Sequence, residues 1–181
     1  MRLFTGIGLP PEVLSSLEHA LDELRPTADI KWSPPENLHI TTKFIGEWPE
    51  GRLEELRETL RGLPRRPHFE IDMHGLGWYP NPHSPRVLWA AVHAGDPLRD
   101  LARDTERALA GLGIAVENKP YSPHLTLARI KPPAQLTRLR QTIAALSSDN
   151  FGKFLANSFN LYRSILSPKG SRYSVLSEFP L

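Results

Sequence analysis

The sequence predicts an α+β fold in which two sheets face each other. Short apolar segments with strand periodicity alternate with amphipathic helical segments, and the order of these elements occurs twice along the chain. A length of 181 residues suits one domain or two closely joined halves. We therefore expect a single two-lobed domain over residues 1–181, with motif-bearing halves at roughly 1–80 and 86–181.

The first half alternates strands with two amphipathic helices. Its expected elements are a strand at 3–9, a helix opened by Pro10 and Pro11, strands at 30–32 and 38–45, a helix from about 50 to 62, a strand carrying Phe69, Ile71 and Met73, and a loop over 75–85. Pro and Gly residues at the ends of these segments mark their boundaries.

The second half repeats this order and adds strands at its end. Its expected elements are a strand at 87–93, a helix capped by Asp96 and ended by Gly113, strands at 114–116 and 124–130, a helix carrying Leu136, Leu139, Ile143 and Leu146, and strands near 151–155, 159–166 and 173–179. Few residues are identical between the halves, so the repeat is inferred from the order of elements alone.

The composition excludes several classes of function. The chain has no Cys, which excludes a disulfide framework, a thiolate nucleophile and a Cys-ligated metal. Its net charge of +2 argues against a broad nucleic-acid-binding surface, which needs an extended basic field. No signal peptide and no apolar run of about 18 residues is visible. We therefore expect a cytoplasmic protein that does not associate with a membrane.

One short motif occurs once in each half. His39 and Thr41 lie in the first predicted motif strand, and His124 and Thr126 lie in the second. Residues i and i+2 of a strand point to the same face, so each His shares a face with its Thr. If a pseudo-twofold axis relates the halves, both pairs line the central cleft. The alternative is that both pairs are ordinary residues on the solvated faces of sheets.

Two histidines that face one phosphorus atom have a definite chemistry. Imidazole has an unperturbed pKa near 6.5, so at neutral pH one ring can be a base while the other is an acid. Threonine hydroxyls can hold phosphoryl oxygens. A strained cyclic phosphodiester suits this set, because its cleavage needs only proton transfer and charge stabilisation, with no metal or cofactor.

With these motifs the chain resembles the two-histidine phosphoesterase superfamily and, within it, the RNA 2′,3′-cyclic phosphodiesterases, also called 2′-5′ RNA ligases. The segments that carry the resemblance span nearly the whole chain: Arg2-Leu3-Phe4, Leu9-Pro10, Trp32, Asn37-Leu38-His39-Ile40-Thr41, Phe44-Ile45-Gly46-Glu47, Gly75-Leu76-Gly77, Pro123-His124-Leu125-Thr126-Leu127-Ala128-Arg129, Leu161-Tyr162-Arg163-Ser164, Gly170 and Tyr173. Thr42 departs from the pattern, since the family usually has Leu there. This position lies away from the cleft, so the change should affect packing.

The resemblance implies an α+β fold that is bilobal, with two pseudo-symmetric lobes that each hold an antiparallel sheet and outer helices, and with an active-site cleft between the sheets. It also implies hydrolysis of RNA 2′,3′-cyclic phosphate ends to 2′-phosphomonoesters, together with reversible, ATP-independent 2′-5′ ligation. His39 and His124 would be the catalytic acid/base pair, with His39 favoured as the base on water and His124 as the acid on the leaving 3′ oxygen. In the reverse direction these roles swap. Thr41 and Thr126 would bind the non-bridging oxygens. No cofactor and no metal is expected.

Two cations are further candidates for substrate binding. Lys43 is in phase with His39 and Thr41 in a regular strand, and the alternative is a solvated strand end. Arg129 matches a phosphate-binding Arg of the family, but it has the wrong parity for the face of His124, so a bulge or the strand's end must turn it inward. Phe44, by its parity, should belong to the core, and Tyr121 is expected to pack beside Pro123.

The expected partners are RNA ends or 2′,3′-cyclic nucleotides, including tRNA half-molecules, and we expect a monomer. Two other functions stay open. One is a non-catalytic module that binds RNA or nucleotides, although pure binding does not need two proton-transfer groups. The other is a phosphoesterase that acts on a different small cyclic phosphate.

Overall fold

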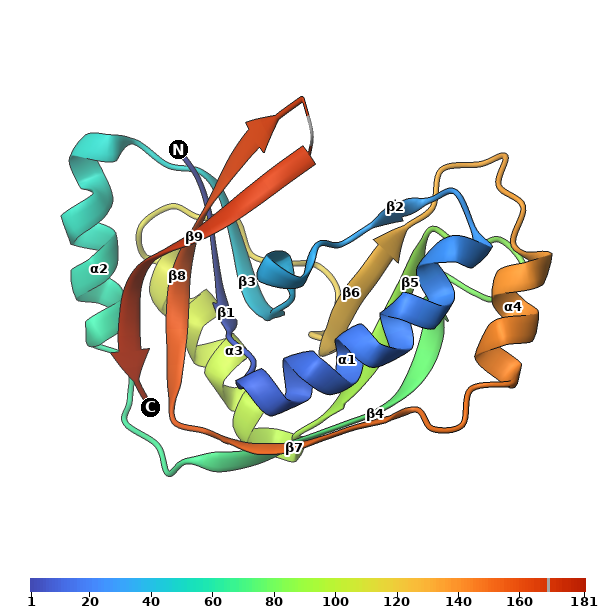
Figure 1. Cartoon of the computed structure of the whole chain (residues 1–181). Helices are drawn as coiled ribbons and strands as arrows, with labels where there is room; N and C mark the ends of the chain where they lie inside the picture. Colours follow the sequence, from blue (N-terminus) through green and yellow to red (C-terminus); the bar gives the residue numbers. More distant parts are fainter. Residues whose placement is uncertain (169) are drawn as a thin grey trace.

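A computed structural model describes residues 1–168 and 170–181 and shows, over these residues, two antiparallel sheets with four α-helices around them (Figure 1). The first sheet has the strand order β3-β1-β8-β9, and the second has the order β2-β6-β5-β4-β7. The strands are β1 (Arg2–Ile7), β2 (Lys31–Trp32), β3 (Ile40–Glu47), β4 (Phe69–Tyr79), β5 (Val87–His93), β6 (His124–Arg129), β7 (Asn150–Ala156), β8 (Ser158–Ser167) and β9 (Gly170–Pro180). This architecture confirms the predicted α+β fold with two antiparallel sheets.

Each sheet draws strands from both halves of the sequence. The four-stranded sheet joins β1 and β3 to β8 and β9 from the end of the chain. The five-stranded sheet joins β2 and β4 of the first half to β5, β6 and β7 of the second. The lobes in space are therefore not the two halves of the sequence, because strands are exchanged between them.

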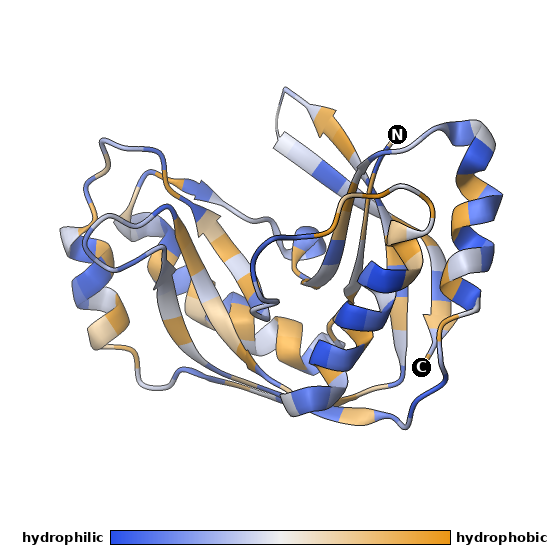
Figure 2. Cartoon of the chain, turned by 180° about the vertical axis from the view of Figure 1, so that it is seen from behind, coloured by the Kyte–Doolittle hydropathy of each residue, from blue (hydrophilic) through white to orange (hydrophobic). Residues whose placement is uncertain are grey.

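The helices lie outside the sheets and bury their leucine faces. Helix α1 (Pro11–Leu24) packs against β7 and against α4 (Thr137–Ala144), while α2 (Leu53–Arg61) packs against β9 and against α3 (Gly95–Ala110), which itself contacts β3. Coloured by hydropathy, the helices show apolar residues along the inner side and hydrophilic residues outside (Figure 2). Within the part of the chain that the structure describes, no helix has the length and apolar content to cross a membrane.

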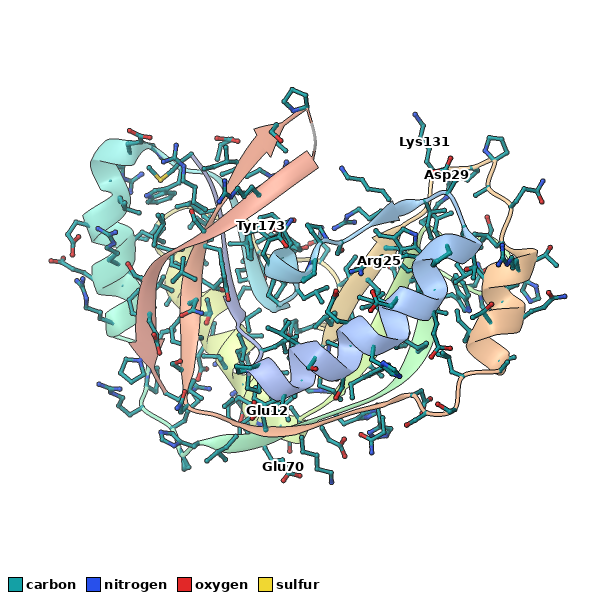
Figure 3. The ribbon with its side chains drawn as sticks, in the orientation of Figure 1. Glu12, Arg25, Asp29, Glu70, Lys131 and Tyr173 are labelled. Carbon is teal, nitrogen blue, oxygen red and sulfur yellow. The ribbon has the colours of Figure 1, made fainter. Side chains whose placement is uncertain are left out.

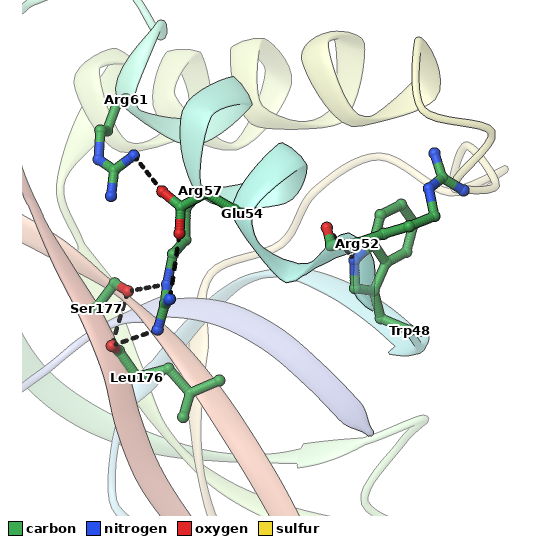
Figure 4. A network of polar contacts seen from close by, with 7 residues as sticks. All are labelled: Trp48, Arg52, Glu54, Arg57, Arg61, Leu176 and Ser177. Carbon is green, nitrogen blue, oxygen red and sulfur yellow. Dashed lines mark hydrogen bonds and ion pairs between the residues drawn. The ribbon is translucent and has the colours of Figure 1, made fainter. Parts of the chain in front are cut away.

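Polar contacts fasten α2 to the edge strand β9 (Figure 4). The Arg57 guanidinium donates to Ser177 Oγ at 2.9 Å and to the Leu176 carbonyl at 3.4 Å. Glu54, one turn earlier, accepts hydrogen bonds from both Arg57 and Arg61. This network fixes the helix beside the strand that carries Tyr173.

Three predicted details of secondary structure are wrong. The loop expected over 75–85 begins later, because β4 continues to Tyr79 through a β-bulge at which Gly75 has a φ of 91°. Asp96 lies inside the first turn of α3, whose N-cap is Ala94. No strand forms over 114–116, because the Ile114 amide donates to the Leu109 carbonyl and so finishes the helix end.

Candidate active site

A β-bulge follows the first motif and decides which side chains lie beside His39. In the pairing of β1 with β3, Gly6 is opposite Thr41 and Thr5 is opposite Lys43, so Thr42 is the extra residue. Phe4 is opposite Phe44. Side chains directly opposite each other share a face of the sheet, and Phe4 and Gly6 are two residues apart. Thr41 and Phe44 therefore lie on one face, and Lys43 lies on the other.

The second motif strand has a bulge at the equivalent place. In the pairing of β5 with β6, Trp89 is opposite Thr126 and Leu88 is opposite Ala128, so Leu127 is the extra residue. Val87 is opposite Arg129. Because Val87 and Trp89 share a face of β5, Arg129 shares the face of Thr126 and His124. The bulge at Leu127 therefore turns Arg129 to the face of His124, as its predicted role needs. Bulges of this kind are common next to active sites.

The contacts of His39 fix its tautomer. Its Nδ1 lies 2.6 Å from the Asn37 carbonyl, which can only accept, so Nδ1 carries the proton of this hydrogen bond. Its Nε2 lies 2.9 Å from Thr41 Oγ1. In the neutral ring Nε2 is therefore the lone-pair nitrogen, and the Thr41 hydroxyl donates to it.

Aromatic rings surround the imidazole of His39. The ring centroids of Phe4, Tyr173 and Tyr162 lie 4.6, 5.2 and 5.5 Å from that of His39. Figure 3 labels Tyr173, which projects from β9 toward the middle of the molecule. This burial lowers the pKa of His39 from 6.5 to about 4. The hydrogen bond to Asn37 opposes the shift, and the positive charges of Arg129 and His124 add to it. His39 is therefore neutral at pH 7.

His124 has the same backbone contact as His39. Its Nδ1 lies 2.8 Å from the carbonyl of Ser122, two residues earlier, just as His39 contacts Asn37. The side chain is exposed, whereas His39 is half-buried. Each motif histidine thus keeps Nε2 free of the backbone, and the charges of His124 and Arg129 act on His39 where β3 and β6 meet.

A hydroxyl group from the other half of the chain holds each motif strand. The carbonyl of Thr41 accepts from the Tyr121 hydroxyl at 2.8 Å, and the carbonyl of Thr126 accepts from Ser33 Oγ at 3.0 Å. Burial raises the pKa of Tyr121 above its usual range, so this phenol keeps its proton and donates. Tyr121 thus ties the segment that leads into the second motif strand to the first motif strand, a contact that the sequence did not indicate.

Lys43 is not placed with the other site residues, and its predicted role as a substrate-binding cation does not fit this position. The side chain is 4% exposed, and its Nζ donates to Glu106 Oε1 at 2.9 Å and to the Ala115 carbonyl at 2.8 Å. The bulge at Thr42 turns it toward α3. Thr42, as expected, is buried and takes part in packing, with its Oγ1 2.7 Å from Thr5 Oγ1.

The same bulge brings Phe44 to the site face, so its predicted core position is wrong. Phe44 is 56% exposed. Its register matches that of Arg129, since both are the third residue after the motif Thr. A periodicity of two cannot reveal this, because an inserted residue reverses the parity that follows it.

Asn37 is a positioning residue that sequence reasoning missed. Its side chain is buried, donating to the Ser171 carbonyl at 2.7 Å and accepting from the Tyr173 amide at 3.2 Å. It therefore joins the segment before His39 to β9, where Tyr173 packs on the imidazole. Among residues 1–168 and 170–181, no group of three or more His, Asp or Glu side chains is arranged to hold a metal ion.

Comparisons with known proteins place this geometry in a family. The model of the family described as LigT like Phosphoesterase matches residues 7–89 and again residues 91–173. The chain is 35% identical over 179 residues to a protein of Archaeoglobus fulgidus named RNA 2′,3′-cyclic phosphodiesterase, with 99% of each chain covered.

Solved structures agree with the sequence comparison. A crystal structure of a Thermus thermophilus protein has a TM-score of 0.84 and 34% identity, covering 100% of this chain and 98% of the other. The structure of Escherichia coli LigT complexed with 3′-AMP has a TM-score of 0.79 and 25% identity, covering 99% and 97%. The two matches of the family model and the full-length similarity show that this chain belongs to the LigT-like phosphoesterase family.

Proposed function

We propose that this protein hydrolyses the 2′,3′-cyclic phosphate at RNA ends to a 2′-phosphomonoester, with His39 and His124 as the base and the acid. The observation that carries the proposal is the matched placement of the two histidines. Each uses Nδ1 on the carbonyl two residues earlier and keeps Nε2 free of the backbone, and the charges of His124 and Arg129 act on His39. The name of the Archaeoglobus fulgidus relative supports the same activity.

The first proton transfer is assigned to His39. Its lowered pKa, about 4, keeps Nε2 unprotonated at neutral pH. Nε2 takes a proton from water as the water oxygen bonds to phosphorus. The bond from phosphorus to the 3′ oxygen breaks, and protonated His124 gives its proton to that oxygen. Each proton transfer contributes about 10² to 10⁴ in rate.

The threonines and Arg129 stabilise the charge of the reacting phosphoryl group. Thr126 and Arg129 share a face with His124, and Thr41 lies beside His39. On substrate binding the Thr41 hydroxyl, which contacts Nε2 in the structure, turns to a non-bridging oxygen and leaves Nε2 for water. The exposed ring of Phe44, on the face of Thr41, offers a surface for the base of the terminal nucleotide.

The same site would also carry out 2′-5′ ligation of RNA ends such as tRNA halves, with the 5′ hydroxyl of one end in the place of water. His39 then takes the proton of that hydroxyl, and His124 gives a proton to the leaving 3′ oxygen. In the reverse reaction, cleavage of the 2′-5′ linkage, His39 donates and His124 accepts, because the same protons move backward along the same path. Ligation needs no ATP, since the cyclic phosphate itself stores the bond energy. We propose that one protein chain is sufficient for either direction, because all six groups in this scheme come from a single chain.

The test uses a short RNA with a 2′,3′-cyclic phosphate end, incubated with the protein and EDTA. The proposal predicts complete conversion to the 2′-phosphate, unaffected by the chelator. Binding of this RNA without turnover would support a binding module instead. Turnover of another small cyclic phosphate, with the RNA left intact, would support a phosphoesterase of different specificity.

A further inference from the structure

A tryptophan lies directly beside the second motif on the same face of the sheet. In the five-stranded sheet Thr126 of β6 is opposite Trp89 of β5, and Trp89 is opposite Gly77 of β4. Paired residues of antiparallel strands share a face, so this row presents Thr126, Trp89 and Gly77 together. The neighbours of Trp89 along β5, Leu88 and Ala90, point into the core and are fully buried.

The indole of Trp89 lies flat across β4, and Gly77 makes this possible. A Cβ added at Gly77 would lie 2.2 Å from Trp89 Cζ2 and 2.3 Å from Cη2. The six-membered part of the indole therefore rests on the main chain of Gly77, and no other residue would leave room for it. Trp89 stays partly exposed.

The surroundings of this indole suit a nucleotide. Toward one end of the sheet, the next row places the small side chain of Ala91 beside His124. A Cβ added at Gly75 would lie 3.7 Å from the Cβ of Ala91, so Gly75 is the neighbour of Ala91 on β4. Toward the other end the next row holds Lys31, Arg129, Val87 and Tyr79, since each is the cross-strand partner of the next. Two cations thus stand in the row beside a partly exposed aromatic ring, and this is the combination that proteins use to bind single-stranded nucleic acid.

We propose that Trp89 forms a second nucleotide subsite, on which the base adjoining the cyclic-phosphate nucleotide stacks. The inference rests on the proposed function, and it extends the substrate from a terminal nucleotide to an RNA of at least two nucleotides. Neighbouring strands lie about 4.8 Å apart, so Trp89 is one strand spacing from Thr126 and within reach of an adjoining base. Arg129 serves the reacting phosphoryl group, and Lys31, its partner on β2, is placed to neutralise the phosphate between the two nucleotides.

The experiment compares kcat/KM for a mononucleotide 2′,3′-cyclic phosphate with that for a dinucleotide carrying the same cyclic end. The wild-type protein is expected to prefer the dinucleotide. Trp89→Ala should reduce the ratio of the two kcat/KM values by about fivefold to a hundredfold, the range for loss of one base stack. Trp89→Phe should keep most of the preference, because it retains an aromatic face.

Two further variants sharpen the result. Gly77→Ala should lower the same ratio, because the new Cβ displaces the indole from the sheet. Leu155→Ala removes an exposed apolar side chain from the edge strand β7 and should leave both substrates unaffected. Circular dichroism checks that each variant is folded.

Two outcomes would overturn the subsite. One is a wild-type protein that turns over both substrates equally well. The other is an equal loss on both substrates in Trp89→Ala, which would make Trp89 a support for Thr126 only. A wild-type protein that cleaves neither substrate would instead contradict the proposed function, and the subsite with it.

Discussion

At the scale of single residues, the environment of His39 differs most from that of a free imidazole. Three aromatic rings bury it, and two positive groups oppose its protonation. His124 has the same Nδ1 contact but is exposed. One residue type in two environments can thus supply both a base and an acid, as pairs of catalytic groups commonly do.

The acid side of the pH profile tests this assignment. A base must be unprotonated to act, so activity should be present above the pKa of His39 and be lost as the pH falls through it. With a pKa of about 4, kcat/KM should hold well below pH 6.5 and decline only near pH 4. A decline centred near pH 6.5 in a protein that is still folded would contradict a buried, neutral His39.

Arg129→Ala should move that decline to higher pH. The positive charge of Arg129 helps to lower the pKa of His39, so its removal lets the ring protonate more easily. Arg138→Ala, on helix α4, should leave the midpoint in place. A midpoint that stays fixed in Arg129→Ala would show that the two groups do not interact.

The sequence predicts much of the site at this scale but not all of it. Because i and i+2 share a face, the pairing of His39 with Thr41 and of His124 with Thr126 follows from spacing alone. For Arg129 the sequence predicts only that a bulge or the strand's end is needed to turn the side chain toward the face of His124. For Lys43 and Phe44 the sequence predicts the wrong faces, because nothing in their spacing reveals the extra residue at Thr42.

At the scale of elements, the bulge in each motif strand reverses the alternation of side chains between the two faces of the sheet. Before the bulge the strand presents His and Thr, and after it the strand presents Phe44 in one case and Arg129 in the other. The remaining elements follow from periodicity, except where strand pairing prevails over a local signal. Residues 75–79 read as a loop because of their glycines, yet they continue β4 because β5 pairs with them and Gly77 accommodates Trp89.

Lys43→Met tests the position that the first bulge gives to this side chain. Methionine fills similar space but removes the donor to the Ala115 carbonyl and one of the two donors to Glu106, whose Oε1 still accepts from the Glu117 amide. We expect the free energy of unfolding to fall by about 1–3 kcal/mol in urea titration, with little change in kcat/KM. Lys119→Met, in an exposed segment, serves as the control. A large loss of kcat/KM at an unchanged free energy of unfolding would contradict this and support substrate binding by Lys43.

Gly6→Ala tests the close approach of β1 to the first motif. An added Cβ would lie 2.7 Å from the Ile40 carbonyl oxygen and 3.4 Å from His39 Cδ2, so β3 must shift near the imidazole. A displacement of about 1 Å can lower the rate by up to about 10²-fold, and we therefore expect kcat to fall by about tenfold or more. Gly51→Ala meets no atom within 4 Å and should be neutral. Equal activity of the two variants would contradict the close approach.

At the scale of the whole molecule, the halves of the sequence hold each other in place. Strands from each half enter both sheets, and hydroxyl groups of Tyr121 and Ser33 cross to the opposite motif strands. The sequence shows the repeated order of elements but not this exchange, because nothing local specifies which sheet receives β4, β8 or β9. Those choices depend on contacts between residues far apart in the chain.

Ser33→Ala and Tyr121→Phe test the crossed hydroxyl contacts. Each removes one hydrogen bond to the main chain of a motif Thr, and each should lower the free energy of unfolding by about 0.5–1.5 kcal/mol. Because the contact sits on a motif strand, kcat should fall as well. Ser16→Ala, whose hydroxyl bonds only within its own helix, provides the comparison. Lower stability with an unchanged kcat would limit these contacts to a structural role.

The central claim is that His39 and His124 together cleave a cyclic phosphate, and phosphorus NMR of the reaction tests it most directly. Adenosine 2′,3′-cyclic phosphate is incubated with EDTA and with the wild-type protein, His39→Ala, His124→Ala, or His83→Ala, which changes an exposed loop residue. We predict a single 2′-phosphate product from the wild type and His83→Ala, and a loss of about 10² to 10⁴ in rate for each motif variant. Undiminished turnover in either His39→Ala or His124→Ala would contradict the claim.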